Sequence, residues 1–159
     1  MRRYIFYFAL MLFFLGANAE SRIFAQGNLQ SAINQYIAKQ AKADGSSEYK
    51  NARKVRTGDL DGDGDRDAVV QYTLEGAGGG NSWSQMMAVF INNKGVYKFA
   101  VEEVVGGKFS VYTSTLSSVS KGVIILDTET CAELPQGICE NPKKSTAKFF
   151  FKQGKLVKA

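Results

Sequence analysis

The sequence predicts an α+β domain in which one N-terminal amphipathic helix packs on an antiparallel β meander sheet. Two observations predict this class. Apolar residues recur at steps of three and four over residues 29–43, which is the helical period. From residue 68 onward, short segments rich in Val, Ile, Thr, Tyr and Phe alternate with turn residues, which is typical of consecutive antiparallel strands.

The helix is expected over residues 29–43. Asn28 is a suitable N-cap, because its side-chain oxygen can accept a hydrogen bond from the first turn. Ile33 and Ile37 lie one turn apart and mark the face that would be buried. The polar residues 45–51 begin with a glycine and are expected to form a loop.

The strands follow the helix in quick succession. They are expected at residues 68–74, 85–91, 96–105, 109–119, 122–128, 146–152 and 155–158. The segment Asn92–Gly95 has the composition of a hairpin turn. The run Phe149–Phe151 does not alternate, so it is either buried on both faces or exposes one phenylalanine.

The first nineteen residues have the pattern of a secretory signal peptide. Arg2 and Arg3 precede an apolar run over residues 4–15, and Ala17 and Ala19 supply the small residues of a cleavage site. The alternative is a membrane anchor, but a spanning helix needs about 20 apolar residues and this run is shorter. We therefore expect one mature domain, 20–159, that is periplasmic or secreted and has no membrane span after cleavage.

The mature chain is basic except in one segment. Without Arg2 and Arg3 it has 18 Lys and Arg against 15 Asp and Glu, a net charge of +3. Residues 59–67 carry five Asp and one Arg, or −4, so the remainder carries +7. Many of the basic residues lie near the end of the chain: Lys143, Lys144, Lys148, Lys152, Lys155 and Lys158. They would favour an anionic partner such as an envelope polymer, or they are solvated lysines that prevent edge pairing. Nucleic acid is not an expected partner.

The two cysteines predict a disulfide. Cys131 and Cys139 are the only cysteines, and export would place them in an oxidising compartment. Closing so short a loop contributes about 2–3 kcal/mol on the chain-entropy model. A zinc site is disfavoured, because the chain contains no histidine to complete the ligand set.

An aspartate-rich loop is the strongest candidate for a site. Aspartates occupy alternate positions from 59 to 67, namely Asp59, Asp61, Asp63, Asp65 and Asp67. Ca²⁺ takes six to eight oxygen ligands at about 2.3–2.6 Å, and a tight loop of this kind supplies them. Gly64 at the sixth position permits the sharp turn. The alternative is a solvated acidic turn, which requires neither that glycine nor so strict an alternation.

The repulsion between these aspartates opposes folding unless a cation is bound, and Ca²⁺ suits the loop better than Mg²⁺, which keeps its waters. An EF-hand is excluded, because the twelfth position is Val70 instead of a bidentate glutamate. The pattern Asp-x-Asp-x-Asp-Gly-x-x-Asp ahead of a strand resembles the calcium loops of FG-GAP and VCBS repeats. That resemblance implies side-chain ligands from Asp59, Asp61, Asp63 and Asp67, and a main-chain carbonyl ligand from Asp65.

This resemblance covers about ten residues and implies Ca²⁺ as the bound ion. FG-GAP and VCBS repeats usually occur in sets that build a propeller, whereas this chain has the motif once and is too short for a full propeller. The wider stretch 58–98 is also similar to small secreted bacterial proteins of unassigned function.

A glycine-rich segment follows the first expected strand of the sheet. The residues Gly76–Gly80 precede Trp83, and no Walker-type lysine or helix follows to bind a phosphate. We therefore expect a strand connection. Trp83 is expected to be core or partly core, with stacking on a ligand as the alternative.

The sequence lacks the usual catalytic groups. Without histidine there is no imidazole base, and Glu102 and Glu103 are neighbours on a strand and point to opposite faces. Three functions remain open. They are an exported calcium-binding accessory or binding module, an inhibitor or immunity-type protein that blocks an enzyme with the loop 76–83, and a hydrolase that uses carboxylates.

Overall fold

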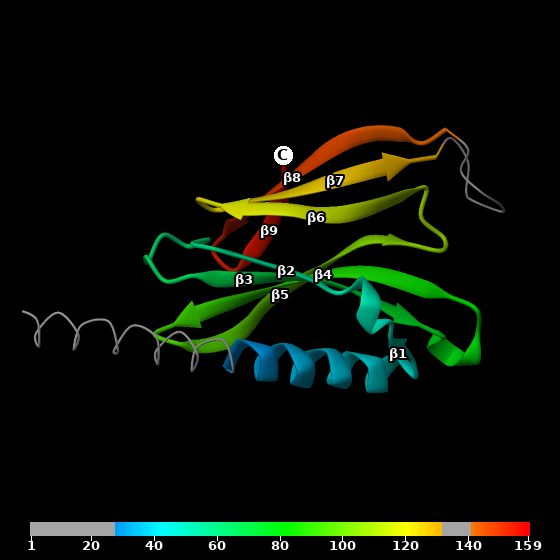
Figure 1. The fold of residues 1–159 in the computed structure, drawn as a ribbon, viewed down its shortest axis with the longest axis horizontal. Coiled ribbons are helices and arrows are strands. Elements are labelled where there is room, and N and C mark those ends of the chain that lie inside the picture. Colours follow the sequence, from blue (N-terminus) through cyan, green and yellow to red (C-terminus); the bar gives the residue numbers. More distant parts are fainter. Residues whose placement is uncertain (1–27, 132–140) are drawn as a thin grey trace, which may run out of the picture.

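The computed structural model describes residues 28–131 and 141–159. These residues form mostly antiparallel β-sheets together with one helix, whose described part spans residues 28–44 (Figure 1). An α+β chain with one helix ahead of the strands agrees with the expected class. The expected signal segment 1–19 and Cys139 lie outside the described residues, so the cleavage site and the disulfide stay predictions. Among the described helical residues, no segment has the length and apolarity that crossing a membrane would require.

The strands form two sheets, where a single sheet was expected. The first sheet holds β1 (Ser47–Glu48), β2 (Lys54–Gly58), β3 (Asp67–Glu75), β4 (Trp83–Asn93) and β5 (Val96–Gly107). The second sheet holds β6 (Tyr112–Ser120), β7 (Val123–Thr130), β8 (Lys143–Lys152) and β9 (Lys155–Lys158). The division occurs after β5, because β6 pairs with β7 and not with β5.

The first sheet also contains pairing that the sequence did not predict. β1 lies in the segment expected to be a loop, and it pairs with the end of β3 through Glu48 and Leu74. β2 pairs with the other half of β3, from Lys54 opposite Gln71 to Gly58 opposite Asp67. Both short strands therefore share one edge of β3.

The three layers of the fold are the helix, the first sheet and the second sheet (Figure 1). Ile33 and Ile37 of the helix are 1% and 2% exposed and pack with side chains of β3 and β4 such as Val70 and Phe90. Because β3 is covered by the helix on one face and by the second sheet on the other, eight of its nine residues are buried.

A second core fills the space between the two sheets. Its buried members are Leu60, Val69, Met87, Val89, Val105, Leu116, Ile124, Leu126 and Phe149. This packing answers whether the phenylalanine run of β8 is buried. Phe149 is buried in this core and Phe151 packs against it. Phe150 is half-buried and lies between Val123 and Val157 of the neighbouring strands.

Tight hairpins set the register of three strand pairs, β4 with β5, β6 with β7 and β8 with β9. The turns are Lys94-Gly95, Lys121-Gly122 and Gln153-Gly154, and both residues of each turn have positive φ. Such turns match the right-handed twist of the strands that they connect. The hairpin expected at Asn92–Gly95 is confirmed, since Asn93 pairs with Val96 across it.

Candidate metal centre

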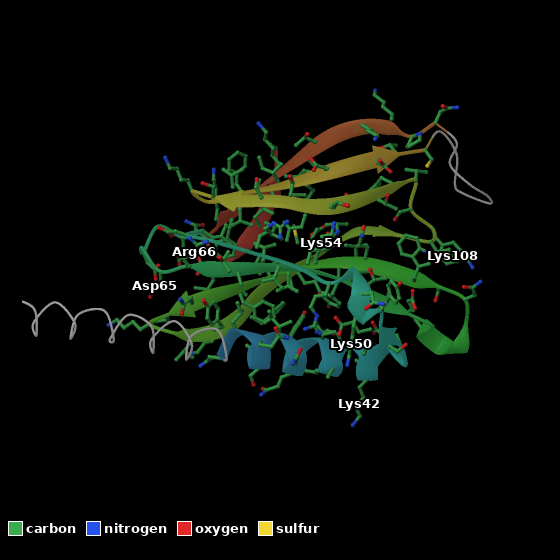
Figure 2. The ribbon with its side chains drawn as sticks, viewed as in Figure 1. Lys42, Lys50, Lys54, Asp65, Arg66 and Lys108 are labelled. Atoms are coloured by element: carbon green, nitrogen blue, oxygen red, sulfur yellow. The ribbon has the colours of Figure 1, made fainter. Side chains whose placement is uncertain are left out.

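The aspartate-rich loop connects β2 to β3 and lies at one end of the two sheets. Figure 2 labels Asp65 and Arg66 at this end and Lys108 at the opposite end. The main-chain carbonyl of Asp59 accepts a hydrogen bond from Gly122 N–H at 3.1 Å, and Gly122 belongs to the β6–β7 hairpin. Leu60 is buried between the sheets. The loop therefore contacts the first and the second sheet together.

Three of the five predicted aspartates come together. Carboxylate oxygens of Asp59, Asp61 and Asp67 all lie within 4.8 Å of one another. Oxygens bound to one Ca²⁺ at about 2.3–2.6 Å can be as far as about 5 Å apart across the ion. The three carboxylates therefore fit a single cation of this size.

Main-chain N–H groups orient two of these carboxylates. The carboxylate of Asp59 accepts hydrogen bonds from Gly62 N–H at 2.7 Å and Gly64 N–H at 3.2 Å. Asp61 accepts one from Asp63 N–H at 3.2 Å. Gly64 has φ +90°, so the sharp turn predicted at the sixth position is present.

Asp67 is the buried member of the group. Its side chain is inaccessible to solvent, and its two oxygens accept hydrogen bonds from Leu60 N–H at 2.7 Å and Asn92 N–H at 2.9 Å. Burial raises the pKa of Asp67 above its ordinary value. The two N–H groups oppose this rise, and the carboxylates of Asp61 and Asp63 add to it. A bound cation would favour the charged form of the same carboxylate.

The other two aspartates do not join the group. Asp63 is exposed, and its carboxylate accepts Asp65 N–H at 2.8 Å. Asp65 accepts Lys94 N–H at 2.9 Å, so its carboxylate is directed to the β4–β5 turn. This position agrees with the expectation that the side chain of Asp65 does not bind the ion. The carbonyl ligand that the resemblance implies at Asp65 stays a prediction.

The two glutamates of β5 do point to opposite faces, as expected. Glu102 accepts a hydrogen bond from the Tyr72 hydroxyl on the helix side of the first sheet. Glu103 is exposed and lines a cavity between the sheets. The structure therefore does not bring these two carboxylates together.

A second cluster lies at the opposite end of the molecule. Trp83 is half-buried, which agrees with the expectation that it is core or partly core. Its main-chain carbonyl accepts Lys108 N–H at 3.0 Å, which places the β5–β6 loop beside the glycine-rich loop 76–82. Phe109 of that β5–β6 loop is 76% exposed. Sequence reasoning assigned Phe109 to a strand, and only its position after Gly106-Gly107 hinted at a loop.

No family model, curated protein or solved structure matches this chain. The resemblance to FG-GAP and VCBS calcium loops therefore stays a prediction from the aspartate pattern.

Proposed function

We propose that this protein is an exported calcium-binding accessory or binding module, in which Ca²⁺ has a structural role. The observation that carries the proposal is the convergence of Asp59, Asp61 and Asp67 within 4.8 Å. The expected signal peptide supports a periplasmic or extracellular location, where calcium modules bind at about 10⁻⁴–10⁻³ M. The ligand of such a module would be a protein or an anionic envelope polymer.

The loop resembles one FG-GAP or VCBS calcium loop set at the start of a strand. Asp59, Asp61 and Asp67 would supply carboxylate ligands, with Asp63 and the carbonyl of Asp65 completing the set on closure. The ion would remove the repulsion among carboxylates that are held close together. Ca²⁺ matches this all-oxygen, flexible loop better than Mg²⁺ does, because Mg²⁺ demands a rigid octahedron.

The structural role follows from the contacts of the loop. Leu60 enters the core between the sheets, and Asp67 begins β3, the strand that is buried on both faces. A cation between Asp59 and Asp67 would hold the two ends of this loop together. In this proposal the helix is an amphipathic cover, and β3, β4 and β5 form the meander on which it packs.

Thermal denaturation tests the proposal. In calcium at ten times its Kd, the free energy of unfolding should rise by about 1.4 kcal/mol, because the ion binds only the folded state. For a domain of this size that is an increase in Tm of about 5 °C relative to chelator. Mg²⁺ at the same concentration should give a smaller increase. Equal Tm values in calcium and in chelator would refute a structural calcium ion.

Two variants separate the ion from other effects of charge. Asp61→Asn removes one of the carboxylates that repel one another, so its Tm in chelator should be at least as high as that of the wild type. The increase in Tm produced by calcium should be abolished in this variant. Asp127→Asn, on the exposed side of β7, is the matched control and should keep that increase. Retention of the full increase in Asp61→Asn would place the ion elsewhere.

A second candidate function is an inhibitor or immunity-type protein. The exposed Phe109 beside Trp83 and the loop 76–82 favours it, because large aromatic side chains often anchor protein interfaces. Pull-downs from envelope extract should then recover an enzyme with the wild-type protein and lose it with Phe109→Ala. Val157→Ala, a substitution of another exposed apolar residue, is the control. Identical proteins recovered by the wild type and Phe109→Ala would reject this candidate.

A further inference from the structure

The inner face of the second sheet changes from apolar to polar along its length. Near the aspartate loop it carries Leu116, Leu126 and Phe149, which are buried in the core. At the other end the positions that follow at intervals of two or four residues carry hydroxyl groups: Tyr112, Ser114, Thr128, Thr130 and Ser145. The inner face of a sheet in a sandwich is normally apolar, so this patch of residues with hydroxyl groups requires an explanation.

The patch is continuous across three strands. Tyr112 is opposite Thr130, Ser114 is opposite Thr128, and Thr128 is opposite Ser145. Directly opposed side chains on one face have Cβ atoms about 4.5–5.5 Å apart. The five hydroxyl groups therefore lie within reach of one small molecule.

These hydroxyl groups line a cavity of about 440 Å³ between the sheets. Charged residues of both sheets also line it: Glu103 of β5 from the first sheet, and Lys148 of β8 and Lys158 of β9 from the second. Leu126 and Leu156 supply apolar surface. The volume lies within the range of about 300–1,000 Å³ that is usual for small-molecule sites.

Most of the polar groups of the cavity are available to a ligand. Ser114 and Thr128 hydrogen-bond each other at 3.2 Å. Within residues 28–131 and 141–159, the side-chain hydroxyl groups of Tyr112, Thr130 and Ser145 form no hydrogen bond. In the same part of the chain, Glu103 and Lys158 form no ion pair.

We propose that this cavity binds a small carbohydrate, a monosaccharide or disaccharide. Each protein hydroxyl group both donates and accepts hydrogen bonds, as sugar hydroxyl groups do, while Glu103 accepts and Lys158 donates. Leu126, Leu156 and the ring of Tyr112 offer apolar surface to the C–H face of a sugar. An apolar ligand would bury the hydroxyl groups without partners, at a cost in free energy. The site is separate from the aspartate loop and does not depend on calcium.

Titration with sugars followed by ¹⁵N–¹H correlation NMR tests the proposal. The sugars are glucose, galactose, N-acetylglucosamine and maltose, each added to the millimolar range. At least one should cause saturable shifts of the main-chain amide signals of Ser114, Thr128 and Thr130. The absence of saturable shifts at these amides with all four sugars would overturn the proposal.

Two variants and one control locate the binding. Thr130→Val and Ser145→Ala each remove a hydroxyl group that has no hydrogen bond to the described protein, so both should fold normally. Each should weaken binding about threefold to tenfold, the amount expected for one lost hydrogen bond. Thr115→Val, on the exposed face of β6, should bind as the wild type does. Unchanged affinity in both cavity variants would overturn the assignment of the site.

Discussion

At the scale of single residues, Glu102 is the most unusual carboxylate outside the aspartate loop. It lies half-buried on the helix side of the first sheet, where the Tyr72 hydroxyl donates a hydrogen bond to it. Burial raises the pKa of Glu102 above its ordinary 4.5. The hydrogen bonds from Tyr72 and Tyr36 oppose that rise, and the Asp44 carboxylate adds to it. The surroundings of Glu102 therefore disfavour its charged form.

This position predicts a pH dependence of stability. The pKa of Glu102 is higher in the native state than in the unfolded state. The native state therefore binds the proton more tightly than the unfolded state does. The wild type should lose this contribution to the free energy of unfolding as the pH rises from about 4.5 through the native pKa. Glu102→Gln keeps a side-chain oxygen that can accept the hydrogen bond from the Tyr72 hydroxyl. The glutamine side chain does not titrate.

The stability of Glu102→Gln relative to the wild type should therefore increase from about pH 4 to about pH 7. Urea denaturation of both proteins across this range measures the difference. A difference that stays constant with pH would contradict the assignment of burial as the dominant effect on Glu102.

At the scale of elements, the contact between β2 and β6 holds the aspartate loop against the second sheet. Arg56 of β2 donates a side-chain hydrogen bond to the Ser117 carbonyl of β6 at 3.1 Å. A Cβ atom added at Gly58 would lie 2.7 Å from the Val119 carbonyl oxygen. The closeness of these two strands therefore requires glycine at position 58, directly before the loop.

Gly58→Ala should destabilise the fold by about 1–3 kcal/mol, because the main chain of β6 must move to accept the methyl group. Gly80→Ala is the matched control. Its added Cβ atom would make only an ordinary contact at 3.6 Å, so the change should stay within about 0.5 kcal/mol. Urea denaturation in chelator measures both. Equal stabilities of the two variants would show that β2 and β6 separate easily.

At the scale of the whole molecule, a buried glutamine joins the two sheets. Gln71 of β3 is 2% exposed, and its side-chain amide donates to the Ser114 carbonyl and accepts Leu116 N–H at 2.8 Å. The side-chain oxygen of Gln85 in β4 accepts a further hydrogen bond from Ser114 N–H at 3.1 Å. These amide groups satisfy main-chain groups of β6 that a neighbouring strand would otherwise satisfy.

Gln71→Met keeps the approximate shape of the side chain but leaves Leu116 N–H and the Ser114 carbonyl without partners. Each buried unpaired group costs about 1–3 kcal/mol, so the free energy of unfolding should fall by about 2–5 kcal/mol. Gln35→Met on the exposed side of the helix is the control and should change it by less than about 0.5 kcal/mol. A loss as small as that of the control would mean that water replaces the amide.

The sequence predicts the local features of this fold well. The helical period around Ile33 and most of the expected strand segments match the structure, because each depends on residues a few positions apart. It predicts neither β1 nor β2. Ser47–Glu48 has no apolar alternation and is a strand only through its pairing with β3. The partition into two sheets is likewise invisible, because pairing partners are set by contacts between distant residues.

The candidate sites divide in the same way. The aspartate pattern identifies the loop from sequence, since its ligands are consecutive in the chain. The sequence does not show that Asp59, Asp61 and Asp67 meet while Asp65 turns to Lys94. The hydroxyl groups of the carbohydrate cavity come from three strands, so no local pattern could have indicated them.

By itself the sequence determined the helix, the positions of most strands and the aspartate loop, because short-range periodicity and turn chemistry specify them. Only the tertiary structure decided which aspartates converge, how Gln71 joins the sheets and where an open cavity remains. The physical reason is that burial, close approach of main chains and hydrogen bonding to β6 depend on residues that are adjacent in space and distant along the chain.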